Sequence, residues 1–172
     1  GDLDLYVGKW AEPNALFRNL GNLKFLNVSA TAGPDFQLAA PHRGAAFGDL
    51  DNDGRLDMVV SVLGGRAKLF RNISNNENHW VALQLTGTKS NRMAIGAQIR
   101  LTTDDGAGGS KVQYNQVTTS TGFACSSDVR VHFGLGAAKS VRELQIIWPS
   151  GLKQVLTGLP IDRIIPVKEP VL

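Results

Sequence analysis

The chain has 172 residues, of which 42% are hydrophobic and 19% charged, so it is long enough to bury a core and too apolar to be disordered. The formal net charge is +3, but lysines and arginines are scattered along the chain, which excludes the basic stripe of a nucleic-acid-binding surface. No apolar run approaches the roughly 20 residues of a membrane helix, so we expect no membrane insertion. The only cysteine, Cys125, excludes an internal disulfide and is expected to be a small buried side chain.

Short β-branched runs separated by glycines predict an all-β fold. In the first part of the chain we expect strands at residues 3–8, 15–19, 24–28, 44–48, 56–63 and 67–72. The segment 30–43 contains two prolines and is predicted to be a connecting loop, with His42 as a loop or rim residue.

Residues 1–72 contain a repeat. Residues 1–7 align with 54–60, and 16–19 align with 69–72, at the same offset and without a gap. A constant offset of about 50 residues is typical of the blades of a β-propeller. The first part of the chain is therefore predicted to consist of propeller-type repeats.

An acidic loop joins two of the predicted strands. Four aspartates at loop positions 1, 3, 5 and 9 and a glycine at position 6 form its pattern: Asp49, Asp51, Asp53, Asp57 and Gly54. So many carboxylates would repel one another unless a cation lay among them, and calcium takes six to eight oxygen ligands from such alternating side chains. The pattern predicts a calcium site, with the backbone carbonyl of Arg55 as a further ligand. The alternative is a solvated Asp-Gly turn without a metal.

The loop is not a helix-loop-helix calcium site, because Val60 stands where that site needs a glutamate. Residues 47–60 instead resemble the calcium loop of FG-GAP (VCBS-type) β-propeller repeats. The resemblance implies propeller-type repeats over residues 1–75, with the first repeat truncated at its N-terminus.

The repeat also pairs individual side chains. Phe17 and Phe70 occupy equivalent positions and are both expected in the core of their repeats. Asp4 aligns with Asp57, the last acid of the loop, so we expect the chain to begin inside an earlier loop of the same kind and Asp4 to hold no metal.

The remainder of the chain carries no copy of the repeat. A polar stretch at 73–78 is interpreted as a domain boundary. Alternation of period two predicts short strands at 79–85, 97–102, 111–118, 129–133, 143–148, 153–156 and 163–167. Seven short strands over about ninety residues favour a β-sandwich, which we place at 78–170.

Four motifs in this second part resemble the ASPIC/UnbV domain. They are Asn-His-Trp-Val at 78–81, Ser-Asn-Arg at 90–92 with Ala-Ile-Gly-Ala at 94–97, His-Phe-Gly-Leu-Gly at 132–136, and Trp-Pro-Ser-Gly at 148–151. In that family the domain usually follows FG-GAP repeats. The resemblance implies this architecture and an extracytoplasmic setting, and it brings no catalytic activity with it.

An enzymatic site is not predicted. No serine stands in a nucleophile-elbow pattern, and the three histidines lie in different segments: His42, His79 and His132. The pair Gly134 and Gly136 lacks the third glycine of a dinucleotide-binding fingerprint.

Two further loops and two tryptophans carry weaker expectations. Residues 104–106 (Asp-Asp-Gly) are expected to form an exposed turn rather than a second metal site. The loop 90–92 is either a ligand-facing loop or a turn capped by its asparagine, and the sequence leaves both open. Trp80 and Trp148 are expected to pack in the sandwich core.

The sequence as a whole predicts propeller-type repeats followed by a β-sandwich. The expected function is that of a non-catalytic, calcium-binding adhesion or recognition module of a secreted or cell-surface protein, which binds a protein or a glycan. The alternative is an accessory, carbohydrate-presenting domain of a larger degradative enzyme. We also expect an unpaired sheet edge, covered by the sandwich or by a second copy of the chain in a homodimer.

Overall fold

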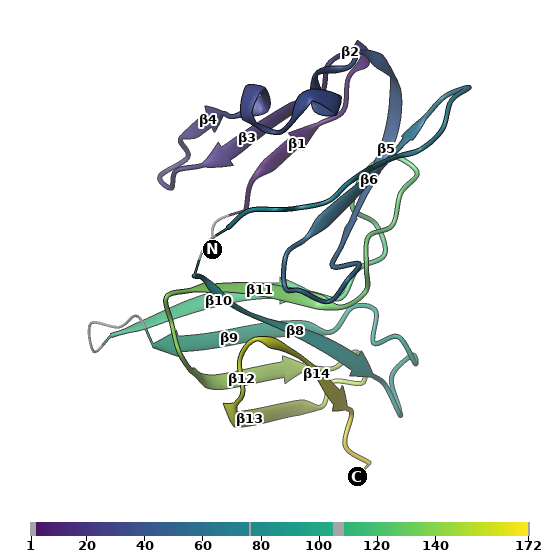
Figure 1. Cartoon of the computed structure of the whole chain (residues 1–172). Coiled ribbons are helices and arrows are strands. Elements are labelled where there is room, and N and C mark those ends of the chain that lie inside the picture. Colours follow the sequence, from purple (N-terminus) through teal and green to yellow (C-terminus); the bar gives the residue numbers. More distant parts are fainter. Residues whose placement is uncertain (1–2, 76, 105–108, 172) are drawn as a thin grey trace.

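The structure is a computed structural model that describes residues 3–75, 77–104 and 109–171. Almost all of its regular structure is β, as the sequence predicted, and the strands form four sheets (Figure 1). Among the described residues these sheets stay open, and no closed propeller is formed. We call the part built by β1–β7 the repeat region and the part built by β8–β14 the β-sandwich.

The repeat region consists of two sheets, with strand orders β1-β3-β4 and β2-β5-β6-β7. Its strands are β1 (Leu5–Val7), β2 (Trp10–Glu12), β3 (Ala15–Asn19), β4 (Phe25–Asn27), β5 (Ala40–Gly48), β6 (Asp57–Val62) and β7 (Lys68–Phe70). Two short 3-10 helices, η1 (Ser29–Thr31) and η2 (Pro34–Gln37), connect β4 to β5.

The connecting segment is more ordered than predicted. It contains both 3-10 helices and the first residues of β5, and His42 lies buried in that strand rather than in a loop. Pro41 is tolerated in β5 because it pairs with Trp10 next to a bulge, where the ladder is already irregular. Phe36 of η2 is buried in the core, so the segment packs as well as connects.

The core of the repeat region lies between its two sheets. Phe36, Met58 and Val60 are buried there, and Tyr6, Leu16 and Phe70 are among the side chains packed against them. Successive side chains of a strand point to opposite faces, so Phe17, the neighbour of Leu16, faces away from this core. The prediction that Phe17 and Phe70 share equivalent core positions is therefore wrong. The two repeats contribute opposite faces to one shared core.

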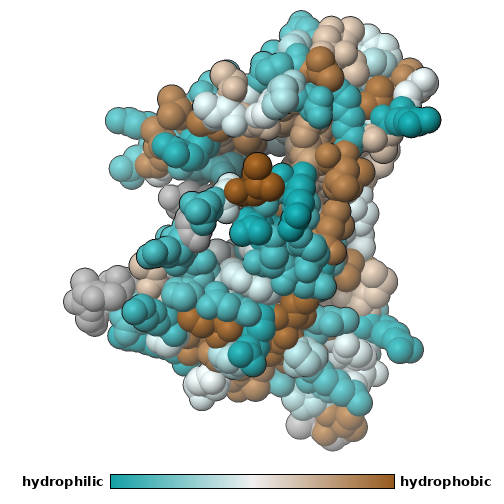
Figure 2. Space-filling view, viewed as in Figure 1, coloured by the Kyte–Doolittle hydropathy of each residue, from teal (hydrophilic) through white to brown (hydrophobic). Residues whose placement is uncertain are grey.

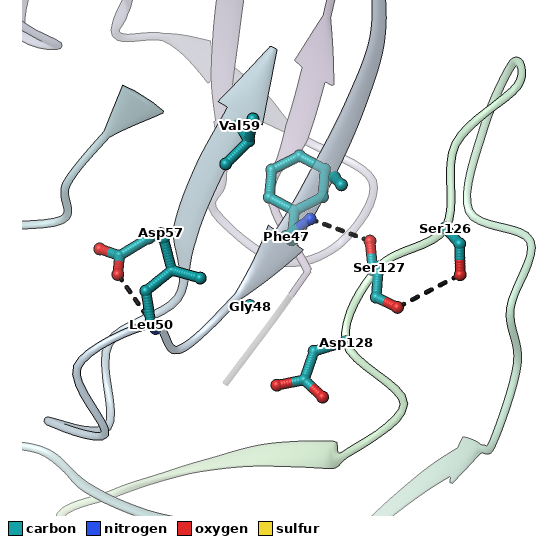
Figure 3. A pocket seen from close by; sticks show the side chains of 9 residues that line it. Phe47, Gly48, Leu50, Asp57, Val59, Ser126, Ser127 and Asp128 are labelled. Atoms are coloured by element: carbon teal, nitrogen blue, oxygen red, sulfur yellow. Dashed lines mark hydrogen bonds between the residues drawn. The ribbon is translucent and has the colours of Figure 1, made fainter. Parts of the chain in front are cut away.

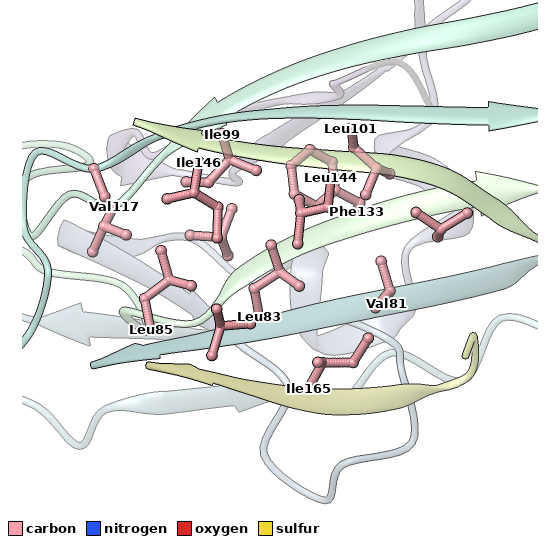
Figure 4. Packing of buried hydrophobic residues seen from close by; sticks show 14 of the residues in the cluster. Val81, Leu83, Leu85, Ile99, Leu101, Val117, Phe133, Leu144, Ile146 and Ile165 are labelled. Carbon is pink, nitrogen blue, oxygen red and sulfur yellow. The ribbon is translucent and has the colours of Figure 1, made fainter. Parts of the chain in front are cut away.

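The β-sandwich consists of two facing sheets, β10-β9-β12-β13 and β11-β8-β14. Its strands are β8 (His79–Thr86), β9 (Gln98–Asp104), β10 (Ser110–Gln116), β11 (Val131–Gly136), β12 (Val141–Ile147), β13 (Lys153–Leu159) and β14 (Arg163–Lys168). All neighbouring pairs are antiparallel except β14, which runs parallel to β8. Figure 4 shows aliphatic and aromatic side chains from both sheets filling the space between them.

Two features close the sandwich at one end. Trp148 is 1% exposed in the core, as predicted, and the turn after it is made by the N–H of Gly151 donating to the Trp148 carbonyl at 2.8 Å. Glu169, which follows β14 and is 1% exposed, accepts hydrogen bonds from the backbone N–H groups of Thr88, Lys89 and Ser90. This carboxylate ties the loop after β8 to the C-terminal strand.

The repeat region and the β-sandwich also touch away from the linker. The segment before β11 lies along the free edge of β5, where the N–H of Asp128 donates to the Phe47 carbonyl at 2.9 Å and the Phe47 N–H donates to Ser127 Oγ at 3.0 Å. A Cβ atom on Gly44 would lie 2.8 Å from the Phe123 carbonyl oxygen and 3.1 Å from the Cβ of Cys125. The sandwich therefore covers this part of the sheet edge, and Figure 2 shows the two parts joined along one side and separated by a notch on the other.

No helix among the described residues is long and apolar enough to cross a bilayer.

Candidate metal centre

The acidic loop joins β5 to β6 and wraps around its own first carboxylate. Gly54 has φ +88° and Asn52 φ +60°, left-handed conformations that turn the chain sharply. Asp49 is 4% exposed, and its two carboxylate oxygens accept the N–H groups of Asp53 at 3.0 Å and of Gly54 at 2.9 Å. The loop is thus folded inward around an acid.

Three of the predicted ligands come together. Asp49, Asp51 and Asp53 each offer a carboxylate oxygen, and these oxygens lie within 4.8 Å of one another. Carboxylates so close repel each other unless positive charge lies beside them. An oxygen-only donor set of this kind fits a hard cation such as calcium, which takes side-chain and backbone oxygens in flexible geometry.

Two arginines partly neutralise the cluster. Arg71 pairs with Asp51 and lies 3.7 Å from Asp53, and Arg55 pairs with Asp53 through its guanidinium. Burial alone would raise the pKa of Asp53, but hydrogen bonds and charge from Arg55 hold it below its usual value. Three carboxylates against two guanidinium groups leave the cluster negative, and calcium would compete with these arginines for its oxygens.

Asp57 lies outside the group of three. Its carboxylate is buried and accepts the N–H of Asn72 at 2.8 Å and of Leu50 at 3.2 Å. The equivalent pair in the first repeat makes the same contact, since the N–H of Asn19 donates to Asp4 at 2.8 Å. In both repeats this aspartate therefore ties the start of one strand, β1 or β6, to the end of the strand that pairs with it, β3 or β7. Asp57 as a calcium ligand stays a prediction, and so does the carbonyl of Arg55.

The asparagines at the ends of these two strands cap the turns that follow. Asn19 accepts the N–H of Gly21 at 2.9 Å, and Asn72 accepts the N–H of Ser74 at 3.0 Å, so each caps the turn that follows its strand.

Three side chains of the β-sandwich reach the loop, and the sequence did not single them out for it. They are Trp80, Arg130 and His132. Burial holds the pKa of His132 below its usual value, although its hydrogen bond to the Gly54 carbonyl acts in the opposite direction. A carbonyl can only accept, so Nε2 carries the proton in this contact. Trp80 was expected in the sandwich core, but it packs on the loop instead.

The other sequence candidates do not gather into a site. His42 contacts the Lys9 carbonyl, and His79 pairs with Asp162 at 2.7 Å, so neither shares a partner with His132. Asn91 bonds both the N–H and the carbonyl of Ile95, which favours the capped-turn interpretation of its loop. Asp104 pairs with Arg142 at 2.9 Å, while the rest of that predicted turn falls outside the described residues.

Two pockets adjoin the contact between the repeat region and the sandwich, and neither is lined by a histidine. The larger, of about 280 Å³, lies beside the acidic loop. Figure 3 shows Asp57 and Leu50 on one side of it and Ser127 and Asp128 on the other. Its walls combine apolar side chains, two serines and two aspartates, and among the described residues the hydrogen bonds of the serine hydroxyls do not go to either aspartate.

Comparisons with known proteins match two family models to separate parts of the chain. The family model described as an FG-GAP-like repeat matches residues 1–60, and the model described as ASPIC and UnbV matches residues 87–171. The chain therefore combines an FG-GAP-like repeat with an ASPIC/UnbV domain, as its motifs predicted.

The chain is also similar to cartilage acidic protein 1. It is 35% identical to the mouse (Mus musculus) protein over 74 residues and 33% identical to the human protein over 76 residues. The Xenopus tropicalis protein is 30% identical over 73 residues. These matches cover 41–42% of this chain and span 11% of the length of each relative.

Proposed function

We propose that this chain is a non-catalytic, calcium-binding recognition module of a secreted or cell-surface protein. The observation that carries the proposal is the group of three carboxylates in the β5–β6 loop, whose oxygens lie within 4.8 Å of one another. Asp49, Asp51 and Asp53 would hold the ion, with Asp57 and the Arg55 carbonyl completing its shell. The FG-GAP-like match supports the same assignment.

The role of calcium is to hold the loop in its wrapped form. A ligand that binds only the folded state stabilises it by RT ln(1 + [L]/Kd), or roughly 2–4 kcal/mol for a micromolar site at millimolar calcium. Extracellular fluids supply calcium at that level. The relatives, which are named for cartilage, favour an extracellular setting.

A non-catalytic role is supported by how the histidines are used. Each of the three makes a contact with a backbone carbonyl or a loop carboxylate in a different place. The recognised ligand is a protein or a glycan. The second candidate function, an accessory carbohydrate-presenting domain of a larger degradative enzyme, predicts glycan binding alone.

Thermal unfolding in calcium and in chelator tests the metal. We expect 1 mM calcium to raise the Tm of the chain by several degrees. Asp51→Asn should lose most of this increase. The matched control, Asp35→Asn, changes an exposed acid of η2 and should keep it. An unchanged Tm in the native chain would overturn the calcium assignment.

Binding to a glycan array and pull-down of protein partners, each with calcium and with chelator, distinguish the two candidate functions. Binding of a protein or a glycan that is lost in chelator supports the calcium-binding recognition module. Binding confined to glycans and unchanged by chelator supports the accessory domain.

A further inference from the structure

The acidic loop is held by the β-sandwich through its backbone. Arg130, just before β11, donates from Nη2 to the Asp49 carbonyl at 2.7 Å and from Nη1 to the Asn52 side-chain oxygen at 2.6 Å. Its guanidinium is itself fixed by Asp128, which accepts from Nε at 2.6 Å. The pre-oriented guanidinium group therefore holds the first half of the loop through the Asp49 carbonyl and the Asn52 side chain. It does not hold the loop through the carboxylates of Asp51 or Asp53.

The second half of the loop is held by two rings. His132, two residues further along the chain in β11, donates from Nε2 to the Gly54 carbonyl at 2.9 Å. Trp80 of β8 stacks on His132 with ring centroids 5.9 Å apart and an interplanar angle of 7°. A Cβ atom on Gly54 would lie 2.0 Å from Trp80 Nε1, so the indole rests directly against this glycine.

These contacts span the residues whose conformation determines where the carboxylates point. Asp49, Asn52 and Gly54 bracket all three acids of the cluster, and each of them touches a side chain from the sandwich. Arg130 and His132 flank Val131, which is buried in the sandwich core, so the start of β11 and the residue before it present both donors to the loop.

We propose that Trp80, Arg130 and His132 are positioning residues for calcium: they fix the loop backbone from Asp49 to Gly54, so that metal binding and docking of the β-sandwich are linked. The inference rests on the proposed calcium-binding function. Linkage is reciprocal. If docking of the sandwich raises the calcium affinity of the loop by a given factor, calcium raises the equilibrium constant for docking by the same factor. Trp80 and His132 belong to the sequence motifs at 78–81 and 132–136, and both thereby have the role of holding the acidic loop.

Calorimetric titration of the full chain with calcium tests this. His132→Leu should weaken calcium binding about tenfold, the lower end of the effect of losing an outer-shell partner. His132→Gln, which keeps an N–H donor, should restore most of the loss. A merely structural role would not produce that rescue.

Arg130→Met gives a sharper test, because two effects of opposite sign compete. Removing a positive charge beside a cation site would by itself strengthen calcium binding. Loss of positioning predicts weaker binding instead. Arg100→Met is the matched control. Arg100 and Glu143 pair within the sheet β10-β9-β12-β13, which does not contain β11, so loss of Arg100 should leave the calcium affinity unchanged.

Tryptophan fluorescence supplies an independent readout. Calcium should change the emission of the native chain and of Trp10→Phe, and the change should disappear in Trp80→Phe. Equal affinities for native chain, His132→Leu and Arg130→Met, with an unresponsive Trp80, would overturn the inference while leaving calcium binding in place. Absence of binding to the native chain would overturn the proposed function and this inference with it.

Discussion

Gly54 is subject to two independent constraints. Its φ of +88° disfavours any side chain, and the Trp80 indole occupies the place of a Cβ atom. Gly64 has φ +70° but open space around it, so it reports the backbone effect alone. We expect Gly64→Ala to cost about 1 kcal/mol of unfolding free energy and Gly54→Ala clearly more, measured by urea denaturation.

A double-mutant cycle identifies the source of the difference. If the indole causes it, Trp80→Ala should reduce the additional cost of Gly54→Ala to near that of Gly64→Ala. Although asparagine tolerates positive φ, Gly54→Asn should be no more stable than Gly54→Ala in the native background, because its side chain meets the same indole. An equal cost for the two alanine variants would contradict the contact.

Glu169 predicts an acid sensitivity. Burial would raise its pKa, but hydrogen bonds from Ser150, Ser90 and Thr88 lower the pKa from 4.5 to about 2. A carboxyl with a depressed folded-state pKa stabilises fully above its unfolded value, and its contribution is lost as the pH falls from about 4.5 towards 2. Glu169→Gln should therefore be less stable at pH 7 and should lose less stability over that range.

Urea midpoints between pH 7 and pH 2 measure the effect. Glu143→Gln is the control, because Glu143 is a solvent-accessible partner of Arg100 and should change the profile little. Parallel profiles for the native chain and Glu169→Gln would contradict the role of the carboxylate.

The sequence predicted the acids of the loop but not the residues that hold them. Asp49, Asp51 and Asp53 follow a local spacing, and a local spacing is readable. Arg130 and His132 lie some eighty residues away, and which face of β11 meets the loop depends on how two sheets from different parts of the chain pack together. One signal was present: donors at alternate positions of a strand, flanking a core valine.

At the scale of elements, the central strands of the β-sandwich carry its stability. Leu144 of β12 is fully buried between β9 and β13. Leu144→Ala should cost about 2–5 kcal/mol of unfolding free energy through lost transfer energy and the cavity left behind. Val155→Ala on the edge strand β13, where the side chain is 52% exposed, should stay within about 0.5 kcal/mol. Chemical denaturation at constant calcium compares the two, and similar costs would contradict the packing described.

Apart from β2, which was not predicted, strand positions followed from the sequence pattern within a few residues, whereas the faces were not always assigned correctly. Phe17 and Phe70 are equivalent in sequence, yet only Phe70 packs in the shared core. Stacked repeats bury opposite faces of equivalent strands, so equivalence in sequence does not mean equivalence in burial. The prolines of segment 30–43 suggested a loop. Pro41 nevertheless lies in β5, because the pairing of β5 with β2 contains a bulge that the sequence does not reveal.

At the scale of the whole molecule, one face of the repeat region lacks a partner among the described residues. Tyr6 and Leu16 pack in the shared core, while their repeat equivalents Val59 and Leu69 are 36% and 62% exposed. We expect a second copy of the chain to cover this face, head to tail, so that the mass rises with concentration. Sedimentation should show that Leu69→Lys suppresses the association.

The homodimer expected through a sheet edge makes a different prediction. It would stop at two copies at every concentration, because a twofold interface closes on itself, whereas head-to-tail association continues to add copies. A strictly monomeric native chain at high concentration would contradict both modes of association. Calcium affinity should be the same in Leu69→Lys, since Leu69 lies on β7, outside the group of three acids.

The close approach of Gly44 to Cys125 provides a built-in reporter. The chain has one cysteine, and that thiol is half-buried at the seam where β5 meets the segment leading to β11. A thiol-specific reagent will therefore modify a single, known atom, at a rate that rises when the seam opens. Slow labelling in calcium and faster labelling in chelator would measure the opening directly, without any substitution in the protein.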